Sequence, residues 1–90
     1  MILISQDSNR AFFPPFIGEV SCGWDDNAIE LRSTEGAYYH LASYDSPEQA
    51  GIAYEFFLDA VKKREEVFTF PEKERVAVIA EKRKAKGDLC

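Results

Sequence analysis

The chain has 90 residues, 46 % of them hydrophobic, with seven Phe, four Tyr and one Trp, and a formal net charge of −5 at pH 7. This length allows one domain, and the aromatic content excludes an intrinsically disordered chain. No run approaches the roughly 18 apolar residues of a membrane span. Two cysteines, Cys22 and Cys90, are too few for a disulfide framework, so we expect a reduced, cytoplasmic protein.

Charge divides the chain at residue 60. Residues 1–60 hold ten carboxylates against two cations, Arg10 and Arg32, a net charge of −8. Residues 61–90 hold nine Lys and Arg against six acids, a net charge of +3. An acidic body repels nucleic acid and attracts cationic partners. We therefore expect the partner to be a basic protein surface or a second copy of the chain, and we expect no direct binding of nucleic acid or membrane.

The first half of the chain predicts strands. Residues 1–6 are a short apolar run rich in β-branched side chains, which indicates a first strand. The double proline within residues 12–16 excludes a helix and a central strand, so an extended edge or crossover is expected there. Residues 17–24, 28–33 and 37–44 then alternate between two sets of side chains, with short turns between them. Such runs predict an antiparallel meander.

Alternation also predicts which side chains of each run share a face. In the middle run Ile29 and Leu31 are expected to point inward, and Glu30 and Arg32 outward. In the first run one face carries Val20, Cys22 and Trp24, and the other carries Glu19, Ser21 and Gly23. In the third run one face carries Tyr39 and Leu41, and the other carries Tyr38, His40 and Ala42.

The clearest local signal is the start of a helix at Ser46-Pro47-Glu48-Gln49. Ser46 can cap, Pro47 suits the first helical position, and Gln49 completes a capping box. Apolar residues then recur at helical spacing, which predicts a helix over residues 46–64 with its stripe on the sheet. The stripe consists of Ala50, Ala53, Phe57, Ala60 and Val61, with Phe56 beside it.

Two further elements follow the helix. Residues 67–70 predict a brief strand that Pro71 ends, and residues 72–86 are helix-prone and weakly amphipathic. The predicted fold is therefore α+β, an antiparallel β-meander of four to five strands with one helix packed on it and a C-terminal helical extension. We expect a single domain over residues 1–71. Residues 72–90 form a helical, basic tail that docks, self-associates or frays.

Three stretches carry a resemblance to a known group. The chain opens with Ile2-Leu3-Ile4-Ser5 and a Gln6-Asp7 step, enters its helix through an acidic turn in residues 41–50, and closes on a strand and proline in residues 67–71. In these features it resembles small uncharacterised proteins of phages and prophages of Gram-positive bacteria. The resemblance covers residues 1–71, and residues 12–16 and 72–90 depart from it. It implies a small, phage-borne accessory protein and no known activity.

Candidate contact residues cluster on the meander and its turns. An aromatic platform beside two carboxylates can bind a cation or a peptide, and exposed tyrosines near carboxylates are typical of interfaces. The alternative for residues 24–27 is a core tryptophan followed by ordinary turn residues. The candidate partner-binding residues are Trp24, Asp25, Asp26, Glu30, Glu35, Tyr38 and Tyr44. Tyr38, Tyr44 and one of Phe12, Phe13 and Phe16 are expected to stay partly exposed.

Catalytic and cofactor chemistry find little support in the sequence. His40 is the only histidine, and no recognisable nucleophile or orienting partner accompanies it. Cys22 alternates with apolar residues, which indicates a buried small hydrophobe. Two adjacent acids, Asp25 and Asp26, make a poor metal site. The chain has no glycine-rich phosphate loop and no Cys-x-x-Cys motif. We expect no catalytic residues, no metal and no cofactor.

Two functions remain open at this stage. The first is a non-enzymatic module that docks on a basic protein through the acidic meander, in its sharpest form a phage-borne inhibitor of a nucleic-acid-binding host protein. The second is a self-assembling structural or accessory protein in which the basic tail helix contacts the acidic body of a neighbour.

Overall fold

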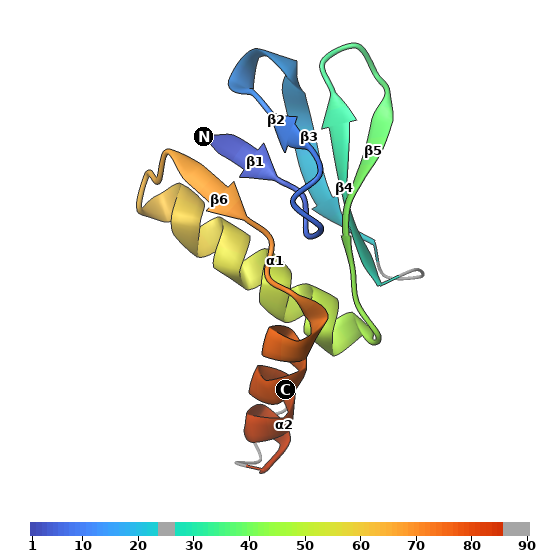
Figure 1. The fold of residues 1–90 in the computed structure, drawn as a ribbon, viewed down its shortest axis with the longest axis vertical. Coiled ribbons are helices and arrows are strands. Elements are labelled where there is room, and N and C mark those ends of the chain that lie inside the picture. The colour runs from blue at the N-terminus through green and yellow to red at the C-terminus, as the bar shows by residue number, and fades with distance from the viewer. Residues whose placement is uncertain (24–26, 86–90) are drawn as a thin grey trace.

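The three alternating runs form an antiparallel sheet in the computed structural model, which describes residues 1–23 and 27–85. Strands β3 (Ile17–Cys22), β4 (Ala28–Ser33) and β5 (Tyr38–Ser43) pair in the order β3-β4-β5 (Figure 1). Gly36 closes the second hairpin with a φ of 90°, a conformation that favours glycine. The fold is therefore α+β, as predicted, but the meander has three strands rather than four or five.

The remaining strands form a second sheet. Its central strand is β1 (Ile2–Ile4), which pairs antiparallel with β2 (Ala11–Phe12) and parallel with β6 (Val67–Thr69). A parallel pair needs a long crossover, and here everything between β1 and β6 serves as that connection. The predicted single meander was wrong for this reason, because β1 takes its second neighbour from the far end of the chain.

The double proline adopts a conformation that differs from the predicted extended one. Pro14–Phe16 form one turn of 3₁₀ helix, with the two prolines in its first positions. The first positions of a helix need no backbone N–H donors, so prolines fit there without loss. The exclusion of helix at this point was therefore wrong.

Helix α1 (Pro47–Lys62) begins where the sequence predicts. Ser46 Oγ accepts a hydrogen bond from the Gln49 backbone N–H at 3.2 Å, and Pro47 occupies the first helical position. Gln49 Oε1 accepts from the backbone N–H of Asp45, also at 3.2 Å. In a capping box this side chain accepts from the backbone N–H of the N-cap residue, which here is Ser46. Gln49 accepts instead from the residue before it, Asp45.

Helix α1 lies along both sheets and joins their cores (Figure 1). The Phe57 ring contacts two rings, those of Phe68 on β6 and of Phe70 directly after it. Each of their centroids lies 5.8 Å from the Phe57 centroid. Tyr54 donates a hydrogen bond from its hydroxyl to the carbonyl oxygen of Val20 on β3. One helix therefore closes a core that two small sheets share.

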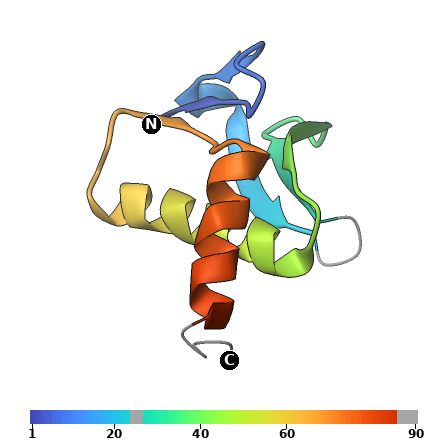
Figure 2. The same cartoon turned by 60° about the horizontal axis from the view of Figure 1, so that its bottom comes forward.

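Helix α2 (Lys73–Ala85) crosses α1, as Figure 2 shows. Val76 is fully buried and Ala80 is 8 % exposed, and both belong to the core cluster. The Arg75 guanidinium lies over the Phe56 ring at 5.6 Å. The C-terminal helix is present as predicted, and of the alternatives left open for it, the structure shows it docked on its own chain.

Two β-bulges interrupt the alternation of side chains that the sequence predicts for the meander. The pairing shifts between Ile29↔Ala42 and Glu30↔His40, so that Leu41 is the extra residue on β5. Leu41 and Ala42 are consequently both buried, and the predicted grouping of Ala42 with the exposed Tyr38 and His40 was wrong. The second bulge, at Gly18 on β3, lies between Ile17↔Ser33 and Glu19↔Arg32.

Among the residues that the structure describes, no helix combines the length and the apolar character needed to cross a membrane.

Candidate protein-binding face

The outer side of the three-stranded sheet gathers the polar side chains of the meander. The register places them in two rows across the strands. Residues directly opposite each other in an antiparallel pair have Cβ atoms roughly 4.5–5.5 Å apart, so each row is contiguous. We call these six residues the acidic face: Glu19, Arg32 and Tyr38 in one row, and Ser21, Glu30 and His40 in the other.

Tyr38 is the aromatic centre of the first row. Its side chain is 68 % exposed, which confirms the expected exposure. The guanidinium of Arg32 lies 5.9 Å from the centroid of the Tyr38 ring. This cation–π contact holds a flat aromatic surface on the outside of the sheet. An exposed tyrosine held in one orientation is a suitable anchor for a protein partner.

The charges are distributed unevenly over the molecule. All three ion pairs found in the described part of the chain lie on the helical side: Asp59–Lys63 at 3.0 Å, Asp45–Lys73 at 3.5 Å and Glu55–Arg83 at 2.9 Å. Cations from residues 61–90 thus neutralise acids from residues 1–60. These pairs are exposed and stabilise the fold little, but they set where net charge remains.

The net negative charge of the chain is concentrated in the meander. Residues 17–43 contain five acids and one cation, a net charge of −4 with His40 neutral. Of the acids, Glu19 and Glu30 belong to the acidic face, and Glu35 is exposed in the hairpin between β4 and β5. Such a surface attracts a positively charged partner over a distance of about one Debye length, roughly 8–10 Å in physiological salt.

The predicted contact residues divide into three groups. Trp24, Asp25 and Asp26 lie outside the described residues. Glu30 and Tyr38 lie together on the acidic face, with Glu35 in the adjacent hairpin.

Tyr44 forms the third group. It is only 5 % exposed, and its hydroxyl donates a 2.8 Å hydrogen bond to the carbonyl oxygen of Pro71. The expected exposure of Tyr44 was wrong, because its ring is packed in the core beyond the end of β5.

The second row contains the residue types of a catalytic triad: Ser21, Glu30 and His40. Their order across the three strands does not allow a triad to form. Glu30 stands between the other two, since its strand is the middle one. Ser21 and His40 are therefore two strand spacings apart, about 10 Å, which is too far for a base to take the proton of a nucleophile. Within the described residues, no three His, Cys, Asp or Glu side chains are grouped where they could hold a metal ion.

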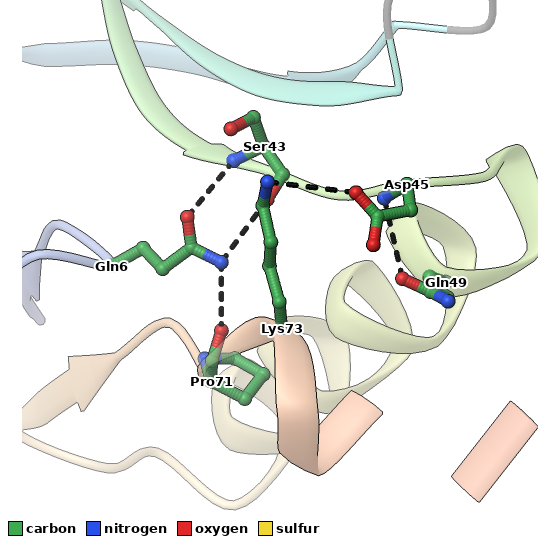
Figure 3. Close-up of polar contacts among 6 residues, drawn as sticks. All are labelled: Gln6, Ser43, Asp45, Gln49, Pro71 and Lys73. Carbon is green, nitrogen blue, oxygen red and sulfur yellow. Dashed lines mark hydrogen bonds and ion pairs between the residues drawn. The ribbon is translucent and has the colours of Figure 1, made fainter. Parts of the chain in front are cut away.

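Gln6 is a structural residue whose role sequence reasoning missed (Figure 3). Its side-chain Oε1 accepts from the Ser43 backbone N–H at 3.1 Å, and its Nε2 donates to the carbonyl oxygens of Ser43 and Pro71 at 3.1 and 3.3 Å. One amide thus connects the end of β1, the end of β5 and the segment before α2.

A polar pocket of about 300 Å³ lies beside Gln6. It opens between the 5–10 loop and β5, and its lining includes Arg10, His40 and Asp7. A hydrogen bond from Ser5 Oγ, and a further one from the Asn9 backbone N–H, hold the pKa of the Asp7 carboxyl below its usual value. The pocket extends the polar surface from His40 toward Arg10. The only sequence signal for it was that Arg10 is one of two cations in residues 1–60.

Comparisons of the chain with protein-family models, with curated proteins and with solved structures returned no match.

Proposed function

We propose that the chain is a non-enzymatic protein-binding module that docks on a basic protein surface through its acidic face. The observation that carries this proposal is the distribution of charge. Three acids on the helical side, Asp45, Glu55 and Asp59, have cationic partners within the chain, whereas residues 17–43 keep a net charge of −4. A surface that concentrates one sign of charge around an exposed aromatic residue favours fast, oriented association with an oppositely charged partner.

The partner in the sharpest form of the proposal is a nucleic-acid-binding protein of the host. Such proteins present surfaces rich in Lys and Arg that are shaped for a polyanion. An acidic sheet face competes for that surface by the same electrostatic attraction. The resemblance to small phage proteins is the support for a phage-borne inhibitor or modulator, and the low cysteine count is the support for a cytoplasmic setting.

Charge reversal tests the proposal. The protein is immobilised, partners are captured from a host lysate, and they are eluted with a salt gradient. The Glu30→Lys/Glu35→Lys variant should lose a basic partner or release it at lower salt, because the attraction that steers association is reduced. The matched control is Glu74→Lys/Glu81→Lys, which makes the same change in net charge at two exposed positions of α2. If the partner eluted at the same salt concentration from wild type and from the Glu30→Lys/Glu35→Lys variant, the acidic face would not be the contact surface.

Self-assembly through the C-terminal helix is the second candidate function. The observation that favours it is Val78, which is 52 % exposed on α2, opposite the side that buries Val76. A Val78→Asp variant would then be monomeric under conditions in which the wild type associates. Light scattering on both proteins separates this candidate from the first, which requires no self-association.

A further inference from the structure

The polar pocket beside Gln6 lies between the loop of residues 5–10 and strand β5. Its volume of about 300 Å³ is at the lower end of the range for ligand pockets, roughly 300–1,000 Å³. Polar and charged residues make up most of its lining: Ser5, Gln6, Asp7, Arg10, His40 and Ser43. A small polar ligand therefore suits this pocket better than an apolar one, because an apolar ligand would leave these groups without hydrogen-bond partners.

One buried serine fixes the loop that forms the first wall of the pocket. Ser5 is 3 % exposed, and its hydroxyl donates a 2.6 Å hydrogen bond to Asp7 Oδ1. The same hydroxyl oxygen accepts a 3.2 Å bond from the backbone N–H of Arg10. The Gln6 backbone N–H donates to the Leu41 carbonyl oxygen at 2.8 Å, and the Gln6 side chain bonds to β5 as Figure 3 shows. The loop is thus held in place without a ligand, which reduces the entropy that a ligand loses on binding.

The strand pairing directs Arg10 toward β5. Leu3 pairs with Phe12 across β1 and β2, and both are buried. The pairing continues beyond the strands, since the Ser5 backbone N–H donates to the Arg10 carbonyl oxygen at 3.0 Å. Arg10 lies two positions before Phe12, so the two side chains leave the same face. That face looks toward β5, because the Phe12 ring contacts Tyr39 at a centroid distance of 5.5 Å. Arg10 therefore extends from the first wall of the pocket toward the second.

The pocket holds two opposite charges that are not paired with each other. In the part of the chain that the structure describes, the Arg10 guanidinium forms no ion pair, hydrogen bond or ring contact. The Asp7 carboxylate accepts bonds at Oδ1 from the Ser5 hydroxyl and the Asn9 backbone N–H, and these hold its pKa below the usual value. Among the described residues it has no cationic partner. A guanidinium binds a carboxylate through two parallel hydrogen bonds, and a carboxylate binds an ammonium group.

We propose that the pocket binds a small zwitterion of the α-amino-acid class, whose carboxylate contacts the Arg10 guanidinium and whose ammonium group contacts the Asp7 carboxylate. A ligand that carries both charges satisfies both groups at once. With His40 neutral, the charges of Asp7 and Arg10 cancel, so a phosphate dianion would be repelled by Asp7 and a dication by Arg10. The proposal does not rest on docking to a basic protein, because it needs neither the acids of the meander nor a protein partner.

Nuclear magnetic resonance of the isotope-labelled full chain tests the proposal. The probes are L-alanine, L-serine and L-asparagine, which are zwitterions with side chains small enough for the pocket. At concentrations up to about 20 mM, at least one of them should shift the backbone amide signals of residues 5–10 and 41–43 in a saturable manner. The absence of a saturable shift with all three probes overturns the proposal.

Blocked forms of the tightest-binding probe test the two charges separately. The N-acetyl form lacks the ammonium group, and the carboxamide form lacks the carboxylate. Each should bind about tenfold more weakly or worse, because each leaves one charge of the pocket without a partner. An N-acetyl form that binds as tightly as the parent would identify a site for anions, and an equally tight carboxamide would identify a site for cations. Either result contradicts a zwitterion site.

Two substitutions connect the binding to the residues named. Arg10→Gln and Asp7→Asn each remove one charge, and each should raise the dissociation constant of the tightest probe about tenfold or more. The matched controls are Lys62→Gln and Glu48→Gln, which remove the same charges at exposed positions outside the pocket and should leave the affinity unchanged. Amide spectra that match wild type away from the substituted residue confirm that each variant is folded. A folded Arg10→Gln or Asp7→Asn variant that binds as tightly as wild type overturns the proposal.

Discussion

The hydroxyl of Tyr44 donates a 2.8 Å hydrogen bond to the carbonyl oxygen of Pro71, across 27 positions of sequence. Tyr44 follows the last strand of the meander, and Pro71 directly precedes α2. The bond is buried, and it connects the three-stranded sheet to the C-terminal helix. The position of α2 on the molecule therefore depends on a tyrosine that sequence reasoning assigned to the surface.

Removing this hydroxyl should weaken the whole domain. We expect Tyr44→Phe to lower the free energy of unfolding by about 1–2 kcal/mol, because a buried carbonyl loses its closest donor. Urea unfolding followed by circular dichroism measures the change. Tyr38→Phe is the control, since the Tyr38 ring is exposed and its loss of a hydroxyl should cost far less. Equal stability of wild type and Tyr44→Phe would contradict a structural role for the bond.

Tyr44 also predicts how stability changes at alkaline pH. Burial raises the pKa of the Tyr44 phenol above its ordinary value of 10.0. Above that value the unfolded chain releases the proton while the folded chain still holds it, so the free energy of unfolding falls as the pH rises. Stability should be independent of this group below pH 10 and should decline above it. In Tyr44→Phe the decline should be shallower, which thermal unfolding at several pH values would detect.

Gln6 should be more sensitive to substitution than another glutamine of similar exposure. Gln6→Leu removes three hydrogen bonds to the backbone of Ser43 and Pro71, and we expect a loss of about 1–3 kcal/mol. Gln49→Leu is the control, because Gln49 Oε1 accepts only one exposed bond, from Asp45. Denaturant titrations of the two variants compare them directly. A Gln49→Leu variant less stable than Gln6→Leu would show that the amide does not connect the sheets as described.

Two glycines predict opposite effects for the same substitution. A Cβ atom at Gly18 would lie 2.9 Å from the Arg32 carbonyl oxygen, closer than real contacts allow. Gly18→Ala should therefore destabilise the fold by about 1–3 kcal/mol through backbone displacement at the bulge. A Cβ atom at Gly51 meets no atom within 4 Å, so Gly51→Ala should stabilise α1 by about 0.5–1 kcal/mol. Thermal melts of both variants should move in opposite directions.

The sequence predicted those parts of the fold that depend on near neighbours. The start of α1 follows from Ser46, Pro47 and Gln49, which act within one helical turn. The outward positions of Glu30, Arg32 and Tyr38 follow from alternation along single strands. The exposure of these residues of the acidic face could therefore be predicted from the sequence alone. The alignment of the second row across the strands could not be predicted, because the register between strands depends on the bulges.

The features that sequence reasoning missed depend on distant pairings or on local irregularities. No local pattern indicates that β6 pairs with β1, since the two strands are separated by nearly the whole chain. The bulge at Leu41 inverts the expected positions beyond it, and alternation carries no mark of an inserted residue. Tyr44 was assigned to the surface because twelve aromatic residues exceed what one small core was expected to hold. Two sheets and two helices provide more interior than that.

The parallel pairing of β1 with β6 also determines the order in which the molecule can be assembled. During synthesis, β3, β4 and β5 can associate soon after Ser43 is made, because their contacts are close in sequence. Strand β1 is made first, yet one edge of it has no neighbour until Thr69 has been added. Closing so long a loop is entropically costly and slows folding. We expect this sheet to form last, and a nascent chain that stalls before β6 exposes an open apolar strand to aggregation.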